Sequence, residues 1–281
     1  MGGAVENEGM SIFPSLSESE RADFERDGFL VWRGVLSSSE VERFKTILKS
    51  LSDRFRLETG LTPQDSVEIR NAIVREPAIM ELLDHPRVLG AMREILSPNI
   101  QLSTSHVFER LPTPAATSGF KAIDWHADGP NPRPPVVQTE RGAVEPRLYA
   151  KAGWFLTDLS QPNKGNLRVV PGSHKLAACP PKDENGDPEG AVQVLTEPGD
   201  VVLFENRVWH AVGPNYAEQA RLNLYMGYCH RWMKPIDFVW IPDELIASAT
   251  PVQKQLLGAA TDALSFYLPS RYEGDLPLGK L

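Results

Sequence analysis

Between residues 99 and 235 the chain alternates short apolar runs with turns rich in proline and glycine, and this alternation limits its fold more than any other feature. Short runs bounded by such turn residues are typical of β-strands. We count about eight of them, the number that closes a double-sheet jelly roll of the cupin kind. The sequence therefore predicts a mainly β protein with a cupin-like jelly-roll core.

Helical patterns flank this strand region on both sides. Ser17 and Ser37 each stand three residues before a Glu, which is the spacing of a capping box at a helix start. Apolar residues recur at helical spacing after Ser37, again around 78–83, after Pro86, and from 242 to 257. We expect one domain over residues 1–281, divided into a loose N-terminal tail at 1–14, a mainly helical flank at 15–98, the β core at 99–235, and a C-terminal helix and tail at 236–281.

The segment Asp124–Gly129 carries the clearest chemistry, because it places His126 two residues before Asp128. On an extended chain two such side chains point to the same face and can share one divalent metal. His210 is the best candidate for a third ligand, across the mouth of the jelly roll. Two imidazoles and one carboxylate form the facial triad of non-haem Fe(II) oxygenases, which leaves coordination positions open.

Arg221 follows His210 by eleven residues and is the most informative companion of the proposed metal ligands. We expect His210 to end one strand and Arg221 to begin the next in a hairpin, so that both point into one cavity. A buried guanidinium can bind a carboxylate through two charge-assisted hydrogen bonds, as a dicarboxylic oxo acid bound to the metal would require. If Arg221 faces the cavity, strand alternation turns Asn223 and Tyr225 the same way, and the leucines between them pack on the other side.

Several motifs occur in a fixed order along the chain, and together they are more specific than any one of them. They are Asp27-Gly28-Phe29, His85-Pro86, Trp125-His126-Ala127-Asp128-Gly129, Asn166 to Lys175 with its Pro-Gly-Ser-His, Pro198 to Phe204, His210 and Arg221. This ordered set resembles the phytanoyl-CoA dioxygenase family of Fe(II)- and 2-oxoglutarate-dependent oxygenases, over about residues 24–232.

The resemblance implies a double-stranded β-helix, with iron bound by His126, Asp128 and His210 and the cosubstrate 2-oxoglutarate bound by Arg221. Trp154 stands where family members often contact the cosubstrate, and we assign Asn223 to the same pocket. The implied reaction uses O2, with ascorbate in support, and releases succinate and CO2 as a small molecule is oxidised. Hydroxylation of a small molecule, in secondary metabolism, is the simplest outcome, and desaturation, ring formation and demethylation share the same chemistry. Oxygenation is favoured over halogenation, because Asp128 fills the position that related halogenases leave open for halide.

Two other functions fit the same residues. A cupin-like hydrolase or isomerase using Zn²⁺ or Mn²⁺ would need the triad but not Arg221. A non-catalytic protein that binds or senses 2-oxoglutarate or metal would keep the fold without turnover. Succinate release from 2-oxoglutarate separates these alternatives from the dioxygenase.

The composition and charge of the chain limit the classes of partner that we expect it to bind. The net charge of −8 disfavours nucleic-acid binding, which requires a basic face. No apolar stretch approaches the roughly 20 residues that span a bilayer, and Met1–Met10 does not resemble a secretory signal. Cys179 and Cys229 make no disulfide framework. We expect a cytoplasmic enzyme with a small-molecule substrate, whose pocket is shaped by the Pro-rich loop at 129–146, with Arg133 and Arg141.

Overall fold

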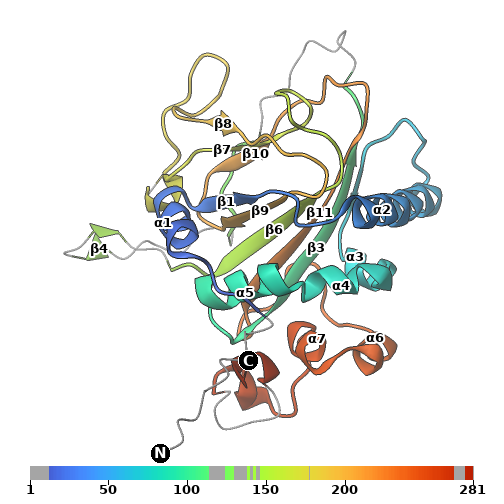
Figure 1. The fold of residues 1–281 in the computed structure, drawn as a ribbon, viewed down its shortest axis with the longest axis vertical. Coiled ribbons are helices and arrows are strands. Elements are labelled where there is room, and N and C mark those ends of the chain that lie inside the picture. The colour runs from blue at the N-terminus through green and yellow to red at the C-terminus, as the bar shows by residue number, and fades with distance from the viewer. Residues whose placement is uncertain are drawn as a thin grey trace, which may run out of the picture.

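The computed structural model describes residues 13–113, 124–129, 138–139, 142–143, 146–176, 178–268 and 276–280. Its centre is a six-stranded antiparallel sheet in the order β1-β9-β6-β11-β3-β2, and a smaller sheet in the order β10-β7-β8 lies over one face of it (Figure 1). The strands of the large sheet are β1 (Phe29–Trp32), β2 (Val67–Ile69), β3 (Ile100–Arg110), β6 (Tyr149–Phe155), β9 (Val201–Glu205) and β11 (Arg221–His230). The small sheet holds β7 (Leu167–Val169), β8 (Val192–Gln193) and β10 (His210–Val212), while β4 (Gln138–Thr139) and β5 (Gly142–Ala143) pair with each other.

Helices cover the other face of the large sheet and one of its ends (Figure 1). Both predicted capping boxes are present, since Ser17 and Ser37 each exchange hydrogen bonds with the Glu three residues later. Among the described residues, no helix combines the length and the apolar character needed to cross a bilayer. The helices are α1 (Glu18–Asp27), α2 (Ser38–Thr59), α3 (Ala72–Arg75), α4 (Met80–Leu83), α5 (Pro86–Ile95), α6 (Asp243–Ser248) and α7 (Pro251–Leu256), with 3-10 turns at Pro77–Ile79, Ser173–Lys175, Ala263–Phe266 and Pro277–Lys280.

Strand alternation on β11 separates a large apolar core from the space between the sheets. Leu222, Leu224 and Met226 belong to the core under the helices, whereas Tyr225 packs on the inner face with Phe155. This is the alternation that the sequence predicted for the strand beginning at Arg221. The inner face of the large sheet is therefore the wall on which polar residues can meet.

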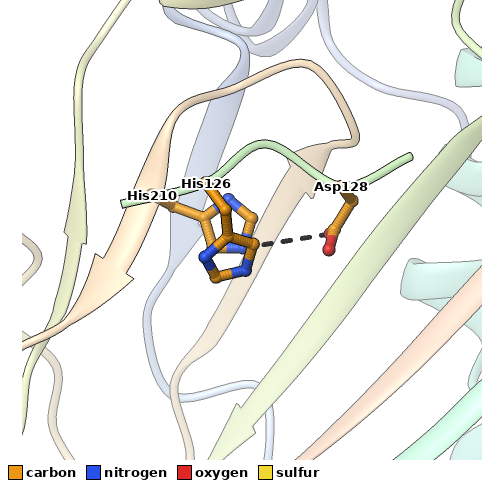
Figure 2. A group of neighbouring side chains, drawn as sticks. All are labelled: His126, Asp128 and His210. Carbon is orange, nitrogen blue, oxygen red and sulfur yellow. Dashed lines mark ion pairs between the residues drawn. The ribbon is translucent and has the colours of Figure 1, made fainter. Parts of the chain in front are cut away.

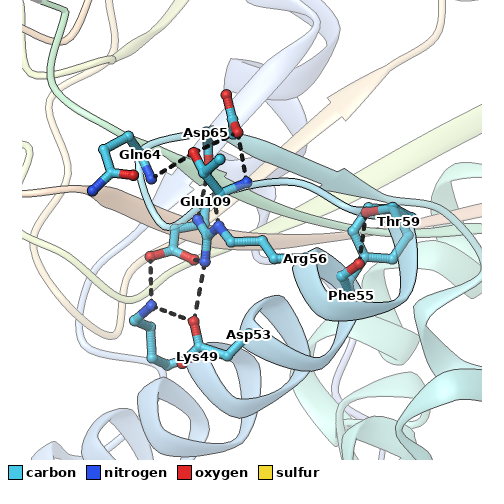
Figure 3. Close-up of polar contacts among 9 residues, drawn as sticks. Lys49, Asp53, Phe55, Arg56, Thr59, Gln64, Asp65 and Glu109 are labelled. Carbon is cyan, nitrogen blue, oxygen red and sulfur yellow. Dashed lines mark hydrogen bonds and ion pairs between the residues drawn. The ribbon is translucent and has the colours of Figure 1, made fainter.

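A buried ion pair attaches the longest helix to the strand beside that wall. Arg56 of α2 lies 2.9 Å from Glu109 of β3, and both side chains are almost fully buried (Figure 3). Lys49 lies 3.3 Å from the same carboxylate, and Arg56 also donates two hydrogen bonds to the backbone carbonyl of Asp65. Because these donors satisfy the buried charge of Glu109, the end of β3 that carries Arg110 is held in place.

This topology corrects two expectations from the sequence and adds a strand that was not predicted. His210 and Arg221 are not joined in a hairpin, because β10 pairs with β7 in the small sheet and β11 pairs with β3 and β6 in the large one. The helix expected at 242–257 is two helices, since the second starts afresh at Pro251 with Thr250 as its cap. Strand β2 was not predicted. The Pro-rich loop with Arg133 and Arg141 lies mostly outside the described residues.

Candidate metal centre

His126 and His210 lie directly opposite each other on neighbouring extended segments. Each backbone N–H donates to the carbonyl of the other residue, at 3.0 and 2.8 Å, which forms an isolated antiparallel bridge. Side chains of such a pair leave the backbone on the same side, and the two rings are 4.3 Å apart between centroids. Figure 2 shows both rings facing the carboxylate of Asp128. The expected extended strand at His126 is thus a single bridge, which gives the same geometry.

The imidazole tautomers are set by the backbone. The Nδ1 atoms of His126 and His210 lie 2.8 and 2.9 Å from the carbonyl oxygens of Asp124 and Val208. A carbonyl only accepts, so each Nδ1 must carry the proton and each Nε2 keeps its lone pair. One ligand atom each from His126, Asp128 and His210 lies within 4.8 Å of the other two. Three lone-pair donors at this spacing can hold one metal ion.

Burial and charge keep these groups in the forms that bind metal. Burial lowers the pKa of His210 to about 4, so this imidazole is neutral at physiological pH. Burial alone would raise the pKa of Asp128, but the charge and hydrogen bond of Lys151, together with the neighbouring histidines, outweigh it and lower the pKa to about 2. Lys151 lies 2.7 Å from the Asp128 carboxylate and was not identified from the sequence. Its position three residues before Trp154 carried no motif that could have revealed it.

Arg221 is 1% exposed and belongs to the inner face of the large sheet. Its Nη2 donates to the hydroxyl of Tyr225 at 2.9 Å, and its guanidinium lies over the ring of Phe155. Its Nε and Nη1 have no hydrogen-bond partner among the described residues. A buried cation with two unused donor groups is a costly arrangement, and it fits a carboxylate ligand.

Two glycines make room for this guanidinium and its partner. Gly165 has a φ of +82°, and a Cβ there would stand 3.1 Å from Cδ of Arg221. Gly153 lies opposite Tyr225, and a Cβ there would stand 2.5 Å from its ring. Side chains at either position would displace Arg221 or Tyr225. Gly165 is the glycine of the turn Asn163-Lys164-Gly165-Asn166.

The two weaker site assignments fare differently. Asn223 is fully buried on the same strand face as Arg221, and neither its amide oxygen nor its nitrogen has a hydrogen-bond partner within the described part of the chain. Trp154 does not reach this space. Its indole lies in the core under the helices and packs edge-on against His85, because β6 turns Lys151 and Phe155 inward instead. The expected contact of Trp154 with a cosubstrate is not supported by this placement.

A cavity of about 780 Å³ adjoins the triad and Tyr225, the hydrogen-bond partner of Arg221. Its wall includes all three triad residues and Lys151 near one end, Tyr225 and Arg110 along the large sheet, and a further polar group, His106. Arg110 faces Arg221 across the β3–β11 pair, and burial together with the charge of Arg221 lowers its pKa. His174 does not line the cavity, and its Nε2 lies 3.3 Å from the carbonyl of Glu25.

Known proteins match most of this chain in sequence. The family model described as "Phytanoyl-CoA dioxygenase (PhyH)" matches residues 24–223. The dioxygenase cdmD of Talaromyces verruculosus is 30% identical over 273 residues, which cover 89% of this chain and 86% of that protein. The ectoine dioxygenase of Bordetella parapertussis is 26% identical over 246 residues, which cover 76% of this chain and 75% of that protein.

Solved structures show the same fold. The crystal structure of HygX from Streptomyces hygroscopicus with nickel and 2-oxoglutarate bound superposes with a TM-score of 0.60, at 22% identity, covering 79% of this chain and 90% of HygX. The jelly-roll fold class expected from the sequence is confirmed. The family match spans the segment with His126 and Asp128, the Pro-Gly-Ser-His turn, His210 and Arg221. The chain therefore belongs to the phytanoyl-CoA dioxygenase family.

Proposed function

We propose that His126, Asp128 and His210 hold the iron of this Fe(II)- and 2-oxoglutarate-dependent dioxygenase, and that Arg221 anchors the cosubstrate while a small molecule is oxidised. The observation that carries the proposal is a three-donor cluster on the wall of a cavity, together with a buried arginine that has two unused donors and that donates to Tyr225 of the same wall. The donor set suits Fe(II), because two neutral imidazoles and one carboxylate leave positions open for a chelating cosubstrate and O2.

The residues of the chain position the reactants. Hydrogen bonds from Nδ1 to backbone carbonyls fix the ring planes of His126 and His210, so both Nε2 atoms stay aimed at one point. Arg221 would bind the distal carboxylate of 2-oxoglutarate through N–H groups that Tyr225 leaves unused, while one N–H of Nη2 donates to Tyr225. With both bound, iron and 2-oxoglutarate supply the oxidising chemistry, in which O2 is consumed and succinate and CO2 are released.

Two residues of the large sheet, Phe204 and Lys151, support the proposed ligands. Phe204 packs edge-on against His210 at 5.0 Å between ring centroids, so the ligand ring is backed by an apolar surface. Lys151 holds Asp128 from the large sheet. These contacts restrict the ligand side chains before any metal arrives, which limits the reorganisation that binding requires.

A hydrolase or isomerase on the same scaffold is disfavoured by Arg221. Such an enzyme has no use for a buried guanidinium aimed at a dicarboxylate, whose burial without a partner costs free energy. The same arginine does not distinguish a catalyst from a 2-oxoglutarate sensor, so turnover must do so.

Succinate formation tests the proposal. Purified protein is incubated with Fe(II), 2-oxoglutarate, ascorbate and air, with and without ectoine and a panel of alicyclic alcohols, and succinate is quantified. We expect metal-dependent succinate formation above the level given by Asp128→Ala. Equal succinate from the wild type and the variant under every condition would favour the sensor alternative.

A further inference from the structure

The wall of the cavity includes a histidine whose buried polar contact the iron chemistry does not use. His106 of β3 lines the cavity, and its Nε2 lies 2.7 Å from Oδ1 of Asp237. Asp237 comes from the segment after β11, and its side chain is fully buried. A histidine and a carboxylate from positions so distant in the chain form a specific contact that packing alone would not require.

The carboxylate of Asp237 is held rigidly. Its Oδ2 accepts hydrogen bonds from the hydroxyl of Thr104 at 2.6 Å, from the backbone N–H of Ser105 at 2.9 Å, and from that of Asn71 at 3.1 Å. Arg70 lies 3.8 Å from Oδ1. With all these donors around it, Asp237 is an ionised acceptor, and burial, which alone would raise its pKa, is outweighed so that the pKa is lowered.

An ionised acceptor on Nε2 determines what the other ring nitrogen can do. Nε2 must carry the proton, so Nδ1 of a neutral His106 is an acceptor with a free lone pair. No hydrogen bond to Nδ1 occurs in the part of the chain that the structure describes. A fixed acceptor therefore faces a space that the substrate must enter.

The sheet register gives the distance scale. His106 lies opposite Tyr225, which lies opposite Gly153 of β6, the strand that also carries Lys151. Two strand spacings, roughly 10 Å, separate β3 from β6. The rings of Tyr149 and Tyr225 cover Gly227 and Gly153, and both tyrosines line the cavity with His106 and the triad.

We propose that His106, oriented by Asp237, accepts a hydrogen bond from a hydroxyl or N–H group of the substrate. The substrate class is then a compact molecule with a hydrogen-bond donor several ångströms from the carbon that is oxidised. This inference rests on the proposed function for the identity of the reaction, but not for the binding contact itself. His106 is a substrate-binding residue, and Asp237 is a positioning residue that acts through it.

Histidine ¹⁵N NMR on the full chain, loaded with Zn(II) and 2-oxoglutarate at pH 8, tests the proposal. The His106 resonances are assigned by their loss in His106→Gln. We expect a protonated Nε2 and an unprotonated Nδ1. Cyclohexanol, cyclohexanone and methoxycyclohexane are then titrated as probes, and Nδ1 should respond to cyclohexanol with an apparent affinity roughly fivefold higher than to the other two.

Two variants sharpen this test. In Asp237→Asn the amide N–H can donate to Nε2, which moves the ring proton to Nδ1, and the preference should shift to cyclohexanone. In His230→Gln, which changes a histidine stacked on Trp232 away from the cavity wall, the alcohol preference should persist. If Asp237→Asn does not fold, the wild type and His230→Gln decide the matter.

A proton on Nδ1 in the wild type, an equal response to all three probes, or no response would each overturn the proposal. Binding of Zn(II) and 2-oxoglutarate is measured in the same samples by calorimetry. Loss of that binding with the alcohol preference intact would refute the proposed function and leave the role of His106 standing.

Discussion

Replacing Arg221 by methionine separates its proposed binding role from a structural one. The substitution keeps the apolar length of the side chain and removes the guanidinium. Two charge-assisted hydrogen bonds to the distal carboxylate of 2-oxoglutarate would be lost, each contributing ~1.5 kcal/mol or more. Together they amount to ~3 kcal/mol, which corresponds to roughly 150-fold weaker 2-oxoglutarate binding. Metal affinity should change little, because Arg221 contacts none of the three proposed ligands.

Arg221→Met should change the stability of the cosubstrate-free protein much less than it changes 2-oxoglutarate affinity. Arg221→Met loses the hydrogen bond to Tyr225, but it also removes two buried donors that have no partner within the described residues. Both effects are on the order of 1–3 kcal/mol and oppose each other, so the free energy of unfolding should change by less than ~2 kcal/mol. Most deletions of a buried charge partner destabilise by more than this.

Calorimetric titration of 2-oxoglutarate with Mn(II) in place of iron, together with urea unfolding of the free protein, measures both quantities. Arg231→Met is the matched control. Arg231 is 2% exposed, donates to the carbonyl of Ala259 and lies over the ring of Phe266, outside the cavity wall. We expect it to destabilise the fold and to leave 2-oxoglutarate affinity within about threefold. A 2-oxoglutarate affinity unchanged in Arg221→Met would refute the reasoning.

Three further predictions concern the ligands, the core and the acid response. His126→Ala and Asp128→Ala should each weaken binding of Fe(II) or Mn(II) by more than about tenfold in an anaerobic titration, and unchanged affinity would place the metal elsewhere. Trp154→Phe should leave 2-oxoglutarate affinity within about threefold, since the indole packs against His85; a large loss would restore the expected cosubstrate contact. Burial alone would raise the pKa of Glu205, but hydrogen bonds from Arg207 and Arg147 lower it below its ordinary 4.5, so its stabilisation is present above that pH and is lost as the pH falls through the folded value. Glu205→Gln should therefore be less stable at pH 7 and lose less stability between pH 5 and pH 3 than the wild type in urea titrations; parallel curves would contradict this assignment.

Local signals in the sequence were sufficient for much of the fold. Capping boxes at Ser17 and Ser37 depend on residues three apart, and both are present in the structure. Alternation along β11 depends only on strand geometry, so the inward face with Tyr225 could be deduced from Arg221 alone. The motif with His126 and Asp128 is likewise local, because the two residues are two positions apart. Their shared direction could therefore be predicted without knowing which segments pack around them.

Features that depend on pairing between distant segments were not accessible in the same way. The sequence does not state which sheet the strand after His210 joins, and the hairpin with Arg221 was the wrong choice between two sheets. Trp154 was misplaced because no residue of β6 had been given a direction, whereas the contact of Lys151 with Asp128 shows which residues face inward. The contact of His106 with Asp237 joins positions 131 residues apart and has no motif.

The most direct measurement is an anaerobic crystal structure with Fe(II) and 2-oxoglutarate bound. We expect iron on Nε2 of His126, Nε2 of His210 and one carboxylate oxygen of Asp128, with the distal carboxylate of 2-oxoglutarate on the guanidinium of Arg221. Iron bound away from these three side chains, or a cosubstrate whose distal carboxylate does not touch Arg221, would contradict this expectation.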